Sequence, residues 1–193
     1  MQPAEPAQNV SVSKPVAPAS PTPAPSAAPP PPPPAAPDLS RTKPLADKLV
    51  AKFPSAKVDY VKPRRVKVTV SPAQIKDAAT FVRDGLGFDH LNVVGGTDYI
   101  AQKEFEVIYF VGSLSVPGQQ DLVFQLAERM PREDSPKVPS LTEVWTGAEY
   151  HERETFEMLG IQFEGHPDLR RLLLPEDWND IPPLRKDYVS PGR

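Results

Sequence analysis

The residues in this chain that could carry chemistry gather near its C-terminal end. They form three blocks, HERETFEMLG at 151–160, GHPDLRR at 165–171 and PLRKDY at 183–188. The first block invites comparison with the zinc-protease helix His-Glu-x-x-His, in which two histidines four residues apart bind one metal ion. Here the residue four positions after His151 is Thr155. The spacing therefore argues against a zinc site of this type.

A second histidine, His166, lies beyond Gly160, so one helix cannot carry both rings. A metal-dependent hydrolase that uses His151 or His166 with nearby glutamates is the most remote of the alternatives considered.

Carboxylates are dense in the first block, and paired carboxylates can perform general acid–base catalysis. Glu149, Glu152, Glu154 and Glu157 surround a single arginine, Arg153. Both Glu149–Arg153 and Arg153–Glu157 have the i, i+4 spacing at which side chains meet on one helix face. We therefore expect a solvated helix face or intrahelical ion pairs here rather than an acid–base pair.

Other kinds of site find little support. The chain has no cysteine, which excludes disulfides, thiolate zinc sites and cysteine-ligated iron–sulfur clusters. No serine lies in a Gly-x-Ser-x-Gly elbow, and no glycine run forms a phosphate-binding loop. The net charge of −3 gives no global attraction to nucleic acid, and we expect none as a partner. The longest wholly apolar run, 107–111, is too short to span a bilayer, so we expect membrane association only through a partner.

The elements that must position these blocks belong to an α+β domain. Hydrophobic periodicity predicts helices over 39–53 and 75–86 and strands over 58–61, 66–70, 91–94 and 104–111, with a further strand around 122–126. Gly95 and Gly96 predict a turn after the third strand. Sequential strands with few helices indicate a mixed or antiparallel sheet with helices on one face.

Three regions follow from the distribution of proline. Residues 1–37 hold 14 of the 27 prolines and predict a disordered proline/alanine-rich tail. Residues 38–130 are the expected sheet domain. Residues 131–193 are the expected strap and partner-binding segment, and three prolines within 131–139 predict irregular structure there.

The last region predicts an extended helix-and-loop clamp. We expect a helix from Ser140 through Trp145, a second over Ala148–Leu159 that ends at Gly160, and a short helix over 169–173 capped by Asp168. Leucines, a tryptophan and arginines alternate along the final segment, a mixture typical of protein–protein interface centres. We therefore interpret the charges as holding a partner.

The three blocks, and the stretch PREDSPKVPSLTEVW at 131–145, resemble the 30-kDa subunit family of respiratory complex I. Its members are the C subunit of the bacterial NADH-quinone oxidoreductase and the J subunit of the enzyme in cyanobacteria and plastids. The resemblance implies a structural subunit of the peripheral arm of a proton-translocating complex, packed against the 49-kDa quinone-site subunit and other peripheral-arm subunits. It implies no catalytic residue, metal or cofactor in this subunit, with iron–sulfur clusters, flavin and quinone carried by others.

Carried over by motif, the implied assembly and interface residues are Glu152, Arg153, Glu154, Gly160, Gly165, His166, Pro167, Asp168, Arg170, Arg171, Pro183, Leu184, Arg185, Lys186 and Asp187. The implied location is peripheral, on the cytoplasmic side of the cell membrane or on the thylakoid membrane. Similar blocks occur in membrane-bound hydrogenases and in F420H2 dehydrogenase, so an equivalent subunit of either enzyme is the alternative.

Overall fold

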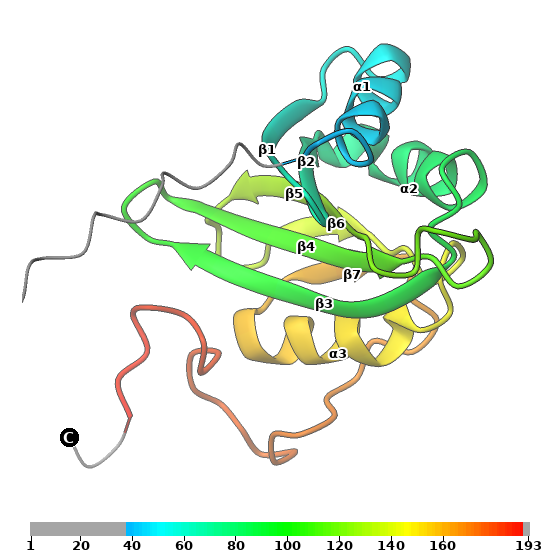
Figure 1. Ribbon diagram of the computed structural model, residues 1–193. Coiled ribbons are helices and arrows are strands. Elements are labelled where there is room, and N and C mark those ends of the chain that lie inside the picture. The colour runs from blue at the N-terminus through cyan, green and yellow to red at the C-terminus, as the bar shows by residue number, and fades with distance from the viewer. Residues whose placement is uncertain (1–37, 191–193) are drawn as a thin grey trace, which may run out of the picture. The chain divides into compact units, whose positions relative to one another are not determined.

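The computed structural model describes residues 38–190, and predictions for residues 1–37 lie outside this range. A five-stranded sheet forms its centre, with strand order β1-β2-β5-β4-β3 (Figure 1). Only β2 and β5 run parallel; the other neighbouring pairs are antiparallel. The prediction of an α+β fold with a mixed sheet is confirmed. The strands are β1 Lys57–Lys62, β2 Arg65–Val70, β3 His90–Tyr99, β4 Glu104–Gly112 and β5 Val123–Pro131.

The main core lies on one face of this sheet. Pairing places Val68, Leu126, Tyr109 and Val94 in one row across β2, β5, β4 and β3, and all four side chains are buried. Alternation along each strand sends the other residues to the opposite face. The helices that were expected on one face of the sheet are found on the face that carries Tyr109.

Three α-helices supply the cover. α1 spans Lys43–Lys52, α2 spans Ile75–Asp84 after the short 3-10 turn Pro72–Gln74, and α3 spans Ala148–Leu159. α1 and α2 lie together beyond β1 and β2, and α3 runs along β3 (Figure 1). The bounds of α3 are those predicted from the sequence. Gly160 ends this helix in the left-handed conformation, with φ +78°.

The predicted turn at Gly95 and Gly96 is wrong, because β3 continues through both residues to Tyr99. A Cβ atom at position 96 would lie 2.3 Å from the Leu159 side chain and 3.0 Å from that of Thr155. Gly96 therefore lets α3 approach the strand closely. In the sequence alone, a glycine with this role cannot be distinguished from a glycine that forms a turn.

The prediction of irregular structure throughout 131–139 is also wrong. β6, Lys137–Pro139, pairs in parallel with β7, Gln162–Glu164. Pro139 terminates β6, and the next amide, that of Ser140, donates to the Glu164 carbonyl. Proline is tolerated at such a position because the pairing does not require its missing N–H.

The expected helix from Ser140 to Trp145 is a series of turns. Leu141 and Trp145 are nevertheless buried in the same core as the sheet, as are Val138, Ile161 and Phe163. The boundary drawn at residue 131 therefore does not separate two cores. Within residues 38–190, none of the helices is both long enough and apolar enough to cross a bilayer.

Candidate partner-binding segment

The segment after β7, residues 165–190, has no helix or strand of its own. Its course is fixed by side chains of α3 and of the loops around Arg132. Most of the residues singled out from the sequence take part in these contacts.

Glu152 lies on the face of α3 toward the sheet and is fully buried. Its carboxylate accepts hydrogen bonds from the Ser140 hydroxyl at 2.6 Å, the Leu141 amide at 2.8 Å and the Tyr109 hydroxyl at 3.0 Å. Burial raises the pKa of Glu152, and these three donors oppose the shift. The contacts join α3 to β4 and to the end of β6, which is a structural role.

Arg153 and Glu157 hold the chain that follows β7. The Arg153 guanidinium donates to the carbonyls of Arg170 and Arg171, each at 3.0 Å. The Glu157 carboxylate accepts the amides of Leu172 at 3.1 Å and Leu173 at 2.8 Å, and also that of Leu174.

Two predictions are therefore wrong. Among the described residues Arg153 forms no ion pair with Glu149 or Glu157. The short helix over 169–173 is absent, because Glu157 binds amides that a helix would otherwise use. Asp168 pairs with the Arg170 side chain at 2.8 Å instead of acting as a cap.

Arg185 anchors the last of the three sequence blocks, residues 183–188, to the rest of the chain. Its guanidinium donates to the Leu159 carbonyl at 2.7 Å and to the Asp134 carbonyl at 2.7 Å, and it lies 5.2 Å from the centre of the Phe105 ring. The residue is 8% exposed, so these contacts use most of its surface within the chain. The role of Arg185 shown here is to dock residues 182–188 on α3 and on the loop before β6.

A second anchor of this block, the ion pairs of Arg132, was not predicted from the sequence. Arg132 donates to Asp98 at 2.8 Å and to Asp187 at 2.7 Å, and the Lys186 amide donates to Asp98 at 2.9 Å. Burial alone would raise the pKa of Asp98, but the bonds from Arg132 and Lys186 outweigh it and leave the pKa below the usual value. Asp98 and Arg132 come from different elements, so no local spacing signals the pair.

His166 is also used within the chain. Its Nε2 atom lies 2.9 Å from the Glu149 carbonyl, and its Nδ1 atom accepts the Asp168 amide at 3.0 Å. This network assigns the proton to Nε2. Both ring nitrogens are therefore occupied, which argues against His166 as a base or metal ligand. In the described part of the chain no three His, Asp or Glu side chains are grouped as a metal site would require.

The remaining predicted residues lie around these fastenings. Gly165 turns the chain with φ +86°, and Pro182 and Pro183 are the first two residues of the turn in which the Arg185 amide donates to the Pro182 carbonyl. The members without such a contact are exposed or half-buried at the surface: Glu154, Pro167, Pro183 and Leu184. The residues that bind through a backbone group or an exposed side chain are also exposed or half-buried: Asp168, Arg170, Arg171, Lys186 and Asp187.

The fastened segment exposes apolar side chains. Leu173 is 61% exposed and Leu184 is 58% exposed, with Leu172 and Ile181 also outside the core. An apolar depression of about 180 Å³ between β3 and α3 has Leu184 at its rim. Exposed apolar side chains of this kind, one of them beside a depression, are typical of a surface that binds another protein.

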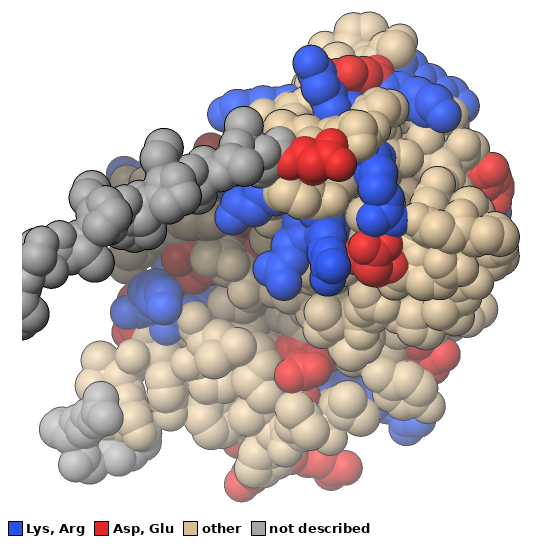
Figure 2. Space-filling view, in the orientation of Figure 1, with Lys and Arg blue, Asp and Glu red and all other residues tan. Residues whose placement is uncertain are grey.

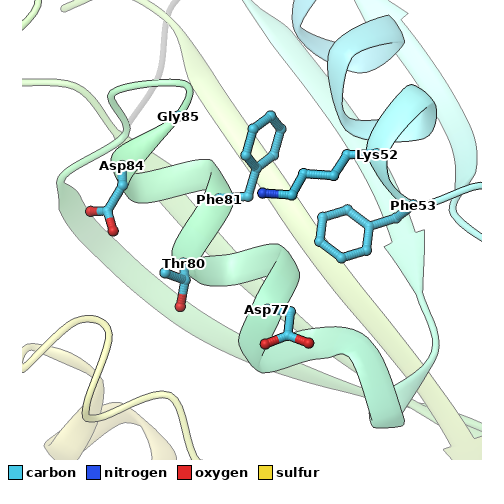
Figure 3. A pocket seen from close by; sticks show the side chains of 7 residues that line it. All are labelled: Lys52, Phe53, Asp77, Thr80, Phe81, Asp84 and Gly85. Atoms are coloured by element: carbon cyan, nitrogen blue, oxygen red, sulfur yellow. The ribbon is translucent and has the colours of Figure 1, made fainter.

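A larger depression lies elsewhere, between α1 and α2, and measures about 570 Å³. Figure 3 shows the Lys52 side chain extending between the rings of Phe53 and Phe81, and its ammonium lies 4.3 Å from the centre of the Phe81 ring. The carboxylates of Asp77 and Asp84 point away from this ammonium (Figure 3). This depression holds no convergent set of catalytic groups.

Comparison with known proteins settles the family. A sequence model described as "Respiratory-chain NADH dehydrogenase, 30 Kd subunit" matches residues 68–193. The chain belongs to this family. The resemblance drawn from its C-terminal blocks is confirmed, as is the general prediction of a complex I-like oxidoreductase subunit.

Two relatives illustrate the range of the 30-kDa family. The C subunit of the F420H2 dehydrogenase of Methanosarcina mazei is 38% identical over 146 residues, covering 75% of this chain and 89% of that protein. The C subunit of the NADH-quinone oxidoreductase of Roseiflexus castenholzii is 46% identical over 125 residues, covering 63% of this chain and 68% of that protein.

Two solved structures share the fold. The trypsin-resistant fragment of Nqo5 is 28% identical with a TM-score of 0.54, covering 65% of this chain and 96% of the fragment. A chain of the archaeal membrane-bound sulfane sulfur reductase has a TM-score of 0.65 at 20% identity, covering 75% of this chain and 84% of that one. The second likeness concerns the fold alone.

Proposed function

We propose that this chain is a scaffold subunit in the peripheral arm of a complex I-like, proton-translocating quinone oxidoreductase. Residues 165–190 pack against the 49-kDa quinone-site subunit. The chain carries no cofactor and no catalytic residue of its own, and it associates with the membrane through the complex, on the cytoplasmic side. The observation that supports this proposal is that residues 165–190 are held in place by hydrogen bonds within the chain and expose leucine side chains.

These hydrogen bonds matter for binding because a segment that becomes ordered only when it binds loses conformational entropy, which lowers the affinity. A free loop of this length would lose backbone and side-chain freedom on docking. Arg153, Glu157 and Arg185 fix the backbone before a partner arrives. Burial of Leu172, Leu173 and Leu184 can then contribute to affinity with little of that loss.

A second candidate is the equivalent subunit of an F420H2 dehydrogenase. It is favoured by the identity with the Methanosarcina mazei protein, which covers more of this chain than the Roseiflexus match does. Both candidates use the same docking segment and differ in the electron donor. Isolation of the tagged complex, with identification of its donor-oxidising subunit and its activity with NADH and with F420H2, distinguishes the two.

The docking proposal is tested by co-expression with the 49-kDa subunit and affinity purification. We expect Leu172→Ser with Leu173→Ser to weaken binding by about 100-fold, because two buried leucines contribute roughly 1.5 kcal/mol or more each. Leu114→Ser is the matched control, since Leu114 is 66% exposed and lies in the loop after β4. Equal recovery of the partner with both variants would contradict the proposal.

A further inference from the structure

Charge is unevenly distributed over the described chain. Residues 38–70 contain nine lysines and arginines against three carboxylates, whereas residues 131–190 contain seven against thirteen. Figure 2 shows the lysines and arginines gathered in the upper part of the view, over α1 and the first two strands. The basic side chains are therefore concentrated on elements other than the leucine-bearing segment.

Five of these cations surround the turn between β1 and β2. We name this set the basic corner, and it consists of Arg41, Lys43, Lys62, Arg64 and Arg65. The Thr42 hydroxyl donates to the Lys62 carbonyl at 2.8 Å, which brings the start of α1 against the turn. All five side chains belong to exposed residues.

The basic corner is only partly neutralised within the described chain. Asp121 serves both Arg41, at 3.0 Å, and Arg64, at 3.5 Å. Within residues 38–190, Lys43, Lys62 and Arg65 have no carboxylate oxygen within 4.0 Å. Residues 1–37 contain one glutamate and one lysine, so their composition supplies no net counter-charge.

The helix dipole adds to the same positive potential. Lys43 is the first residue of α1, and the first turn of this helix contains no acidic residue. A cation at the positive end of a helix is unfavourable, whereas an anion there is stabilised. An external carboxylate at this position would therefore interact favourably with both the dipole and the side chains.

Protection of an edge strand accounts for only part of this pattern. β1 is at the edge of the sheet, and lysines such as Lys57 and Lys62 discourage pairing with another strand. Arg41, Lys43 and Arg64 lie outside β1 and need another explanation.

We propose that the basic corner binds an acidic surface on a second protein subunit of the complex, distinct from the contact made by the leucines. Oppositely charged surfaces steer association and set its orientation and salt dependence. The proposal rests on membership of a multi-subunit complex and is independent of where residues 165–190 dock.

The first test uses the complex purified with the full-length chain. Arg64→Glu with Arg65→Glu should lower the subunit's affinity by about tenfold at moderate salt, and its retention should fall further as sodium chloride is raised. Lys57→Glu with Lys103→Glu is the matched control, because it changes the charge equally at exposed sites away from this turn. Thermal unfolding of each isolated variant checks that the fold is kept, and Arg64→Gln with Arg65→Gln should give an intermediate loss.

The second test identifies the partner. A photo-crosslinking residue at position 64 in the purified complex should attach to a protein segment rich in Asp and Glu. Reversal of those acids to lysine should restore retention of the Arg64→Glu, Arg65→Glu variant. Crosslinks only to lipid or nucleic acid, no crosslink, or retention equal to the control would each overturn the proposal. If the leucine contact with the 49-kDa subunit were disproved, the salt-dependent loss of retention in the Arg64→Glu, Arg65→Glu variant would still be expected. The docking proposal and the basic-corner proposal can therefore fail independently.

Discussion

At the scale of single residues, the charges that suggested an active site mostly stabilise the chain's own fold. Glu152, Glu157 and Arg153 bind hydroxyl, amide and carbonyl groups of this chain, which have no regular secondary-structure partners. A buried charge needs such partners to offset its loss of hydration. The sequence shows which charged residues are present, but it does not show that they bind backbone groups up to 18 residues away.

Glu128 is the exception among the buried carboxylates. It is fully buried on β5 and faces the core, and neither of its oxygens has a hydrogen-bond partner among the described residues. Burial, with a smaller contribution from the charge of Glu152, raises the pKa of Glu128 well above its usual range. The folded state thus binds this proton more tightly than the unfolded chain does.

A pH-dependent stability follows. Because the folded-state pKa of Glu128 is raised, its contribution to the free energy of unfolding decreases as pH rises above about 4.3, the value for an exposed glutamate. We expect Glu128→Gln to increase the free energy of unfolding, and to increase it more at pH 8 than at pH 5. Urea unfolding at both pH values measures this. Glu133→Gln, at an exposed position, should change little; an equal gain for Glu128→Gln at both pH values would contradict the account.

At the scale of elements, the end of α3 fixes where the last block docks. A Cβ atom on Gly160 would lie 2.7 Å from Arg185 Nη2 and 3.3 Å from Pro182 Cγ. The Arg185 guanidinium cannot move away without losing its bonds to the Leu159 and Asp134 carbonyls. The absence of a Cβ atom at Gly160 is therefore required for the docking of residues 182–188.

We expect Gly160→Ala to cost at least about 2 kcal/mol, from left-handed strain together with the displaced arginine. Gly118→Ala is the control, because Gly118 has φ +80° but no atom within 4 Å of a Cβ position. It should show only the strain, about 1 kcal/mol. Thermal or urea unfolding gives both values, and limited proteolysis should cut the Gly160→Ala variant sooner within residues 165–190. Equal losses in the two variants would argue against this requirement.

The elements with regular periodicity were predicted well, and those set by tertiary contact were not. α3 has its predicted bounds, and the strands β1, β2 and β4 lie where alternation placed them. β6 is only three residues long and depends on β7, 23 or more residues later, so no local pattern marks it. Gly95 and Gly96 indicated a turn because sequence alone does not show that a helix packs on the strand.

At the scale of the whole molecule, the sequence predicted the family, and the comparisons confirm it. The assignment of the fifteen C-terminal residues to a partner interface stays a prediction. The structure refines it by separating two groups. Of the fifteen, Arg153 and Arg185 make most of their contacts within the chain, whereas Leu184 is exposed. Leu172 and Leu173, which were outside that assignment, are exposed as well. Burial divides these groups, and burial cannot be read from residue types that alternate along one segment.

The central claim is that residues 165–190 are held in place before a partner binds them. Hydrogen–deuterium exchange of the free chain and of its complex with the 49-kDa subunit tests it most directly. We expect the amides of Leu172, Leu173 and Leu174 to exchange slowly in the free chain, faster in Glu157→Gln, and more slowly again in the wild-type complex. Exchange of these amides at the rate of an unfolded peptide in the free wild-type chain, or no added protection in the complex, would contradict the account.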